Sequence, residues 1–211
     1  MKDTRLPGVL TWSEYQADRR IDFNGFYWRA EGARPGLLFD PMPLSVEQRA
    51  QVAELGGAAW ILLTNADHLR AAPELKAEFS ARLAAPACER ERLGAAAAEV
   101  DLWLAPDADL PAELEDDLAV HWVRGGKSEI EAAFELRPLD AVVFGDIVRS
   151  HVSGELRLLP DPKLSDRAAA AKDLAPLLAR TWRALLLGDG DSLFRDAAGA
   201  VADFRKQLGA A

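Results

Sequence analysis

The 211-residue sequence has one cysteine and three histidines, and its 25 basic residues are outnumbered by 34 acidic ones, for a net charge of −9. A single cysteine, Cys88, excludes an internal disulfide and a zinc site built from several thiolates. The acidic balance argues against nucleic acid as a partner, because a negative surface repels phosphate backbones. No apolar run is long enough to cross a bilayer, so we expect no membrane partner either.

The N-terminal segment MKDTRLPGVLTWSEYQ lacks the continuous apolar stretch of a secretory signal. Together with the scarcity of cysteine, this predicts a cytoplasmic protein. No linker and no internal repeat divides the chain, so we expect a single domain over residues 1–211. The sequence also has no glycine-rich phosphate loop and no nucleophile elbow, which excludes two common kinds of enzyme site.

Apolar segments with the length and composition of strands recur along the chain. They cover residues 8–12, 23–30, 36–41, 58–63, 118–123, 141–144 and 184–187. A helix is predicted after Ser45, which has capping-box spacing to Gln48, and should end at Gly56 and Gly57. Further helices are predicted over 73–82, 166–180 and 196–208. Strands that alternate with helices indicate a layered α/β fold.

Four of the apolar runs end in polar or ionisable clusters. The clusters contain Thr64, Asn65, Asp67 and His68 after the run 58–63, Lys127 after 118–123, Asp146 after 141–144, and Asp189 and Asp191 after 184–187. Ligands of open α/β sheets bind outside the carboxyl ends of strands. Aspartate, asparagine and glycine are also ordinary turn formers. The clusters therefore allow two interpretations, plain turns or parts of one ligand site.

The order of these segments resembles the metallo-β-lactamase superfamily along most of the chain. The segments that carry the resemblance are FNGFYWRAEGARPGLLFDPMPLS, ILLTNADHLRAAPELKAEFSARLAAPACE, RGGKSEIEAAFEL, AVVFGDIV and ALLLGDGDSL. The resemblance implies a four-layer αββα sandwich, with two mixed sheets face to face and helices on the outer faces. It also implies a site along one edge of the sandwich.

The resemblance extends poorly to the first metal site of the family. The family's loop reads His-x-His-x-Asp-His, and here its first and third places hold Leu63 and Asn65. Lys127 holds the place of the histidine in the family's glycine-histidine-threonine segment. Leucine offers no donor atom, and a protonated lysine cannot ligate a metal. We therefore expect no metal at the first site.

The second metal site keeps residues that can bind an ion. By resemblance its ligands would be Asp67, His68, Asp146 and Asp189. This set is richer in oxygen than the family's own, which favours Mn, Fe(II) or Mg relative to Zn, although Zn can still bind. Asp67 and Lys127 are the candidate catalytic residues, and Lys127 would stabilise a developing oxyanion.

Two hypotheses of function follow. In the first, the protein is a hydrolase with at most one divalent metal (Zn, Mn or Fe), and family analogy suggests small-molecule ester or thioester substrates. In the second, the protein binds no metal and has lost catalysis, Lys127 balances the carboxylates, and the fold serves to bind a ligand or partner. Metal content separates the two hypotheses; the sequence names no substrate and no oligomeric state.

The remaining histidines and Cys88 are weaker candidates. His121 lies inside an apolar run and is expected to be a packed or surface strand residue. His151 follows Asp146 by five residues, in a predicted loop that could fold over the site as an accessory base or ligand. Cys88 has no basic residues of a reactive-thiol motif around it and is expected to be inert.

Overall fold

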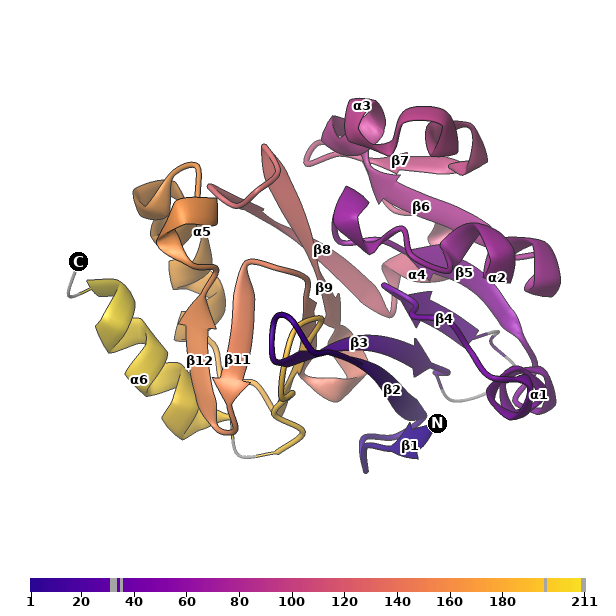
Figure 1. The fold of residues 1–211 in the computed structure, drawn as a ribbon, viewed down its shortest axis with the longest axis horizontal. Helices are drawn as coiled ribbons and strands as arrows, with labels where there is room; N and C mark the ends of the chain where they lie inside the picture. The colour runs from indigo at the N-terminus through magenta and orange to yellow at the C-terminus, as the bar shows by residue number, and fades with distance from the viewer. Residues whose placement is uncertain (31–33, 35, 196, 210–211) are drawn as a thin grey trace.

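The protein forms two β-sheets that pack face to face, with helices on the outer faces (Figure 1). The structure is a computed structural model that describes residues 1–30, 34, 36–195 and 197–209. The strands are β1 (Lys2–Asp3), β2 (Val9–Gln16), β3 (Ile21–Trp28), β4 (Gly36–Phe39), β5 (Ala58–Leu62), β6 (Arg82–Pro86), β7 (Leu102–Leu104), β8 (Leu118–Arg124), β9 (Ile130–Leu136), β10 (Ala141–Phe144), β11 (Val148–Val152), β12 (Glu155–Leu158) and β13 (Ala184–Leu187). The helices are α1 (Val46–Glu54), α2 (Ala72–Phe79), α3 (Arg90–Leu93), α4 (Ala112–Glu115), α5 (Arg167–Ala179) and α6 (Ala198–Gly209). Short 3₁₀ helices cover Ala66–His68, Ala87–Glu89, Gly94–Glu99, Arg137–Leu139 and Asp161–Lys163.

Both large sheets are mixed, as the resemblance implied. The first has the order β1-β2-β3-β4-β5-β6-β7, antiparallel from β1 to β4 and parallel from β4 to β7. The second has the order β13-β10-β9-β8, in which only the β10–β13 pair is parallel. The hairpin β11–β12 forms a small sheet of its own.

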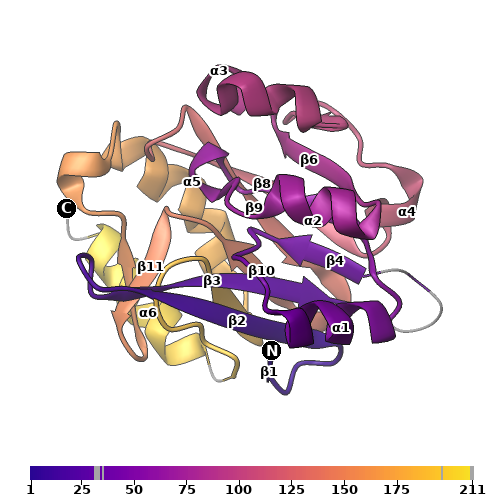
Figure 2. The same cartoon turned by 45° about the vertical axis from the view of Figure 1, so that its right-hand side comes forward.

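Three apolar clusters separate the layers. The cluster between the sheets contains Phe39 and Phe134, whose ring centroids are 5.6 Å apart. The second cluster joins the β8–β10 and β13 sheet to α5, α6 and the hairpin. The third joins the first sheet to α1 and α2, and Figure 2 shows α2 lying over this sheet. Burial of strands on both faces explains why the runs 58–63, 141–144 and 184–187 are continuously apolar.

Helix α1 begins and ends where the sequence predicts. Ser45 accepts a hydrogen bond from the backbone N–H of Gln48, and the Gln48 side chain bonds the Ser45 backbone, which completes the capping box. Gly56 and Gly57 follow with positive φ angles of 99° and 78°, which glycine adopts without strain. Helices α5 and α6 also lie where they were predicted, although residue 196, the predicted start of α6, lies outside the described residues.

The predicted helix over 73–82 is too long. The observed α2 ends at Phe79, Ser80 adopts a left-handed conformation, and β6 begins at Arg82. Strands β1, β6, β7, β9, β11 and β12 were not predicted. Most of them are short, β6 contains Ala84 and Ala85, which have low strand propensity, and two glutamates interrupt the apolar residues of β9. No helix among the described residues is long and apolar enough to cross a bilayer.

Candidate metal centre

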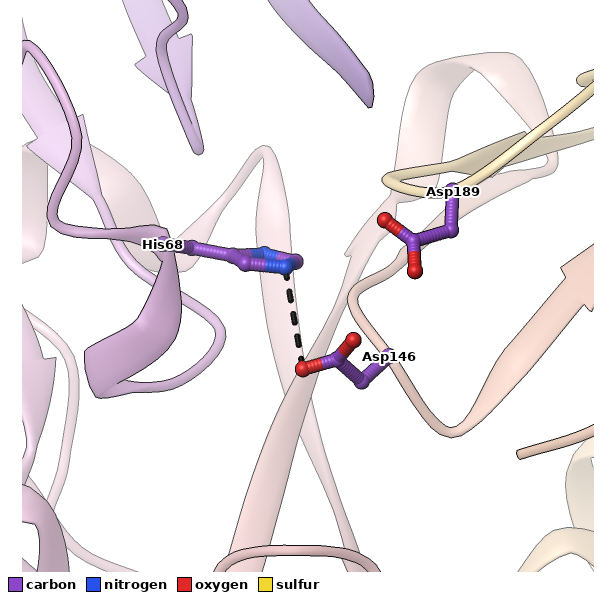
Figure 3. A group of neighbouring side chains, drawn as sticks. All are labelled: His68, Asp146 and Asp189. Carbon is purple, nitrogen blue, oxygen red and sulfur yellow. Dashed lines mark ion pairs between the residues drawn. The ribbon is translucent and has the colours of Figure 1, made fainter. Parts of the chain in front are cut away.

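The loops that follow β4, β5, β10 and β13 meet at one edge of the sandwich. Asp40, His68, Asp146 and Asp189 all lie on these loops, and all four side chains are buried. Figure 3 shows the imidazole of His68 directed toward Asp146 and Asp189, which approach from the opposite sheet. The loops after these strands therefore bring four ionisable side chains together, in addition to forming turns.

His68 is oriented by residues on its own side of the site. Asn65 caps the 3₁₀ helix by accepting a hydrogen bond from the backbone N–H of Asp67 at 2.9 Å. Nδ1 of His68 lies 2.7 Å from Oδ2 of Asp40 and 3.0 Å from Oγ1 of Thr64. The other ring nitrogen, Nε2, is left to face the site. A carboxylate that fixes the ring in this way is the usual outer partner of a metal-binding histidine.

Asp40 also ties two loops together. Its Oδ1 accepts a hydrogen bond from the backbone N–H of Thr64 at 2.8 Å, and its Oδ2 accepts one from Thr64 Oγ1 at 2.7 Å. The residue is fully buried and has a positive φ of 45°, a conformation that aspartate tolerates better than most residues. Asp40 was not predicted as a site residue, although it directly follows the apolar run GLLF, much as Asp146 follows AVVF after one glycine.

Asp146 lies between the histidine and a lysine. Its Oδ2 is 3.8 Å from Nε2 of His68, 2.7 Å from Nζ of Lys127 and 3.4 Å from Nδ2 of Asn65. Burial alone would raise the pKa of Asp146. The electrostatic effects of His68, Lys127 and Arg149, together with the hydrogen bond from Lys127, outweigh burial and lower its pKa to about 2, so the carboxylate is ionised at neutral pH.

Asp189 forms an ion pair with an arginine of strand β11. The pair joins its Oδ2 to Arg149, which was not predicted as a site residue. Its Oδ1 is buried and has no hydrogen-bond partner among the described residues, since Nη2 of Arg70 lies 3.9 Å away. Burial and the nearby charge of Asp146 raise the pKa of Asp189, against the opposing effect of the arginines. A buried carboxylate oxygen with no donor is a place where a cation fits.

Asn24 fixes the loop that carries Asp189. This buried residue of β3 donates from Nδ2 to the backbone carbonyls of Leu187 at 2.7 Å and Gly190 at 2.6 Å. The backbone N–H of Asn24 also donates to Gly188 O at 2.8 Å. The Asp189 loop of the second sheet is thus fastened to a strand of the first.

Two glycines let the loops approach each other. A Cβ atom on Gly145 would lie 2.2 Å from Oγ1 of Thr64, and one on Gly188 would lie 3.0 Å from Cε1 of His68. Only glycine at 145 allows the Asp146 loop this close to Thr64. The glycines after these strands thus admit a neighbouring protein loop.

His68, Asp146 and Asp189 form a buried group that could hold one metal ion. Each offers one ligand atom, and these three atoms lie within 4.8 Å of one another. The set fits a cation because Asp40 already holds Nδ1 of His68 and because Oδ1 of Asp189 lacks a donor. One imidazole and two carboxylates suit Mn²⁺, Fe²⁺ or Zn²⁺.

Comparison with known proteins identifies the fold. A profile of the metallo-beta-lactamase superfamily matches residues 1–208 of the chain. The chain belongs to the metallo-β-lactamase superfamily. A comparison with curated proteins gives no match.

Solved structures of metallo-β-lactamases share the fold at low sequence identity. The enzyme from Erythrobacter litoralis is 16% identical, with a TM-score of 0.67 over 95% of this chain and 89% of that one. The enzyme from Pontibacter korlensis is 12% identical, with a TM-score of 0.69 over 95% and 94%. FIM-1 from Pseudomonas aeruginosa, in its mono-zinc form, is 15% identical, with a TM-score of 0.65 over 95% and 92%.

The residues that hold the places of the superfamily's first-site histidines, by the resemblance, take part in packing, a turn and an ion pair. Leu63 is fully buried in the core, and Asn65 bonds to the backbone of its turn. Nζ of Lys127 lies 2.7 Å from Asp146 and 2.8 Å from Asp67. Burial alone would lower the pKa of Lys127, but Asp146 and Asp67 raise it, so the ammonium stays protonated.

Asp67 lies outside the group of three. One of its oxygens accepts from Lys127 and the other from Nη2 of Arg92 at 2.7 Å. Burial would raise its pKa, but the hydrogen bond and charge of Lys127 and the charge of Arg92 lower it. Its predicted role as a ligand in this superfamily member stays a prediction.

The other candidates lie apart from the metal group. His151 is exposed on strand β11, so the predicted loop is a strand, and its accessory role stays a prediction. His121 is a half-buried strand residue, as expected, with Nε2 2.7 Å from Oε2 of Glu135. Sγ of Cys88 donates to the backbone carbonyl of Ile130, and burial raises the pKa of the thiol, which agrees with an inert cysteine.

Glu131 was also missed by the sequence analysis. It begins the buried part of β9 and carries a carboxylate beside the site, with 2% of its surface exposed. Burial and the charges of Asp146 and Asp40 raise its pKa well above the usual value. Glu131 is one of two glutamates in β9, and nothing in the local sequence distinguishes it from Glu135 as a site residue.

Proposed function

We propose that the protein is a hydrolase that uses one divalent metal ion held by His68, Asp146 and Asp189. The observation that carries the proposal is the meeting of these three buried ligand atoms within 4.8 Å, with the imidazole fixed by Asp40. When bound, the ion would supply a Lewis acid for hydrolysis. Substrates with an ester or thioester group are proposed by analogy with the superfamily.

We propose that Lys127 stabilises the oxyanion. Its ammonium is fixed between Asp146 and Asp67, and 22% of its side chain remains exposed at the edge of the group. A protonated amine held in place before the reaction stabilises negative charge as it develops on a substrate oxygen. Asp67 contributes by holding Lys127 in place, since both residues meet at 2.8 Å.

Hydrolysis of small esters and thioesters tests the proposal. The protein would be assayed as purified, after chelation, and after reloading with Mn²⁺, Zn²⁺ or Fe²⁺, beside Asp146→Asn. Asp173→Asn is the matched control, because Asp173 forms a surface ion pair with Arg124 away from the site. We expect chelation and Asp146→Asn to abolish activity and Asp173→Asn to leave it unchanged. Activity that survives both chelation and Asp146→Asn would contradict the proposal.

A second candidate function is metal-free binding of a ligand or partner. The observation that favours it is that cationic side chains of the protein form ion pairs with the same carboxylates. Lys127 pairs with Asp146, and Arg149 pairs with Asp189. Under this alternative the two cations balance the buried charges, and the fold is kept without catalysis. Absence of metal binding, together with absence of hydrolysis, would favour it.

A further inference from the structure

Glu131 lies where the two sheets meet beside the metal group. Strand β9 belongs to the second sheet, yet the backbone N–H of Ala132 donates to Thr64 O, in the loop that follows β5 of the first sheet, at 3.0 Å. This bond brings the start of β9 against the loop that carries His68. The neighbouring side chain of Glu131 can therefore reach loops from both sheets.

The carboxylate of Glu131 bonds to one group on each loop. Its Oε1 accepts a hydrogen bond from the backbone N–H of Ile147 at 3.0 Å, and Ile147 directly follows Asp146. Its Oε2 accepts one from Nδ2 of Asn65 at 3.1 Å, and Asn65 caps the 3₁₀ helix that presents His68. A single side chain thus joins the loop of one proposed ligand to the loop of another.

A contribution to the stability of the fold does not explain why residue 131 carries a carboxylate. Among the described residues, no lysine, arginine or histidine lies within ion-pair distance of Glu131, whereas Asp146 and Asp40 are close enough to repel it. A buried carboxylate without a cation costs stability. Glu131 supplies two acceptor oxygens, one for each loop. An apolar residue of similar size would supply none.

We propose that Glu131 is a positioning residue that fixes Asp146 relative to His68 and thereby sets the affinity of the metal site. The inference rests on the proposed function, because it concerns the group that would hold the metal. Residues that hold metal ligands from outside alter metal affinity by about 10- to 100-fold when they are replaced. Since Glu131 acts through Asn65 and Ile147, we expect the lower end of that range.

The test uses Glu131→Met, Glu131→Gln and the matched control Glu135→Met. Glu135 lies four residues along the same strand, points to the same face and is 7% exposed, but it pairs with Arg180 and His121 away from the site. Glu131→Met removes both acceptor oxygens, whereas Glu131→Gln keeps one. Co²⁺ would be titrated into each protein by visible absorption, and hydrogen exchange would be measured at the Ile147 amide.

We expect Glu131→Met to weaken Co²⁺ binding about tenfold, to change the Co²⁺ spectrum and to speed exchange at Ile147. Glu131→Gln should have a smaller effect, and Glu135→Met should behave like the parent. Parent-like affinity and spectrum in Glu131→Met would overturn the inference, as would an equal loss in Glu135→Met. If Glu131→Met does not fold, weaker Co²⁺ binding by Glu131→Gln supports the inference and unchanged binding overturns it.

A parent protein that binds no Co²⁺ would instead count against the proposed function. In that case, hydrogen exchange alone tests whether Glu131 connects the two loops. Faster exchange at Ile147 in Glu131→Met supports it, and exchange equal to that of the parent overturns it.

Discussion

Nζ of Lys127 lies 2.7 Å from Oδ2 of Asp146, the same oxygen that faces Nε2 of His68 at 3.8 Å. By the resemblance to the superfamily, Lys127 holds the place of a histidine of the first metal site. A fixed ammonium therefore stands beside the carboxylate of Asp146. Lys127 also lies within ion-pair reach of Asp67.

Lys127→Met should destabilise the protein at neutral pH. The change removes the partner of a buried carboxylate, and such losses cost about 3–5 kcal/mol when burial is deep. We expect the lower end, because 42% of the second partner, Asp67, is exposed. Thermal and urea denaturation of parent and variant would measure the cost. Equal stability at pH 7 without metal would show that Lys127 does not balance these carboxylates.

The loss of stability caused by Lys127→Met should become smaller at acidic pH. The pKa of Asp146 in the folded protein is about 2, below its ordinary value. Its ion pair therefore stabilises the fold above the unfolded pKa of about 4 and is lost as pH falls through the folded value. Denaturation midpoints of parent and variant, measured from pH 7 down to pH 2, should converge. A constant difference across that range would contradict this origin of the cost.

The effect of added Mn²⁺ or Zn²⁺ on the stability of the parent and of Lys127→Met distinguishes the two candidate functions. Strong stabilisation of the parent by metal favours the one-metal hydrolase, because an ion that binds only the folded state raises its stability. Stabilisation of Lys127→Met alone would mean that the lysine has replaced the metal. Melting temperatures with and without each ion provide the measurement.

The combined Leu63→His and Asn65→His variant should not gain a second metal ion. Leu63 is fully buried in the core and Asn65 holds the turn, while Lys127 still places a positive charge where the first ion would lie. Elemental analysis after loading with Zn²⁺ would count the bound ions. Stoichiometric binding of two ions by this variant would contradict the account.

Asp40→Asn should weaken metal binding by about 10- to 100-fold. The carboxylate fixes Nδ1 of His68 at 2.7 Å, and an amide at that place no longer selects the same proton position on the ring. Calorimetric titration gives the affinity, and nitrogen NMR of the imidazole gives the tautomer. An unchanged tautomer with unchanged affinity would exclude this role for Asp40.

Gly145→Ala should cost about 1–3 kcal/mol of stability, because the added methyl group overpacks the site. Its Cβ would lie 2.2 Å from Oγ1 of Thr64, which is itself fixed by Asp40. Gly199→Ala is the matched control, since no atom within 4 Å would meet its Cβ in α6. The control should be neutral or slightly more stable in urea denaturation. Equal stability of Gly145→Ala and the parent would refute the close approach.

The sequence predicts the longer strands and helices from local patterns, because continuous apolar runs and caps such as Ser45 define them. The two facing sheets, and the places of Asp146 and Asp189 at one edge of them, were expected from the resemblance to the superfamily. The sequence did not predict Asp40, Glu131 or Arg149 as site residues. Their importance arises from long-range contacts, such as Asp40 with His68 and Arg149 with Asp189, that no local pattern specifies.

The metal content of the chain tests the central claim most directly. The parent, Asp146→Asn and Asp173→Asn would be purified without chelator, loaded with Mn²⁺, Fe²⁺ or Zn²⁺, and measured by elemental analysis after removal of free ion. The account predicts one divalent ion per chain in the parent and in Asp173→Asn, and loss of that ion in Asp146→Asn. A parent that retains none of the three ions, or an Asp146→Asn variant that retains as much as the parent, would contradict it.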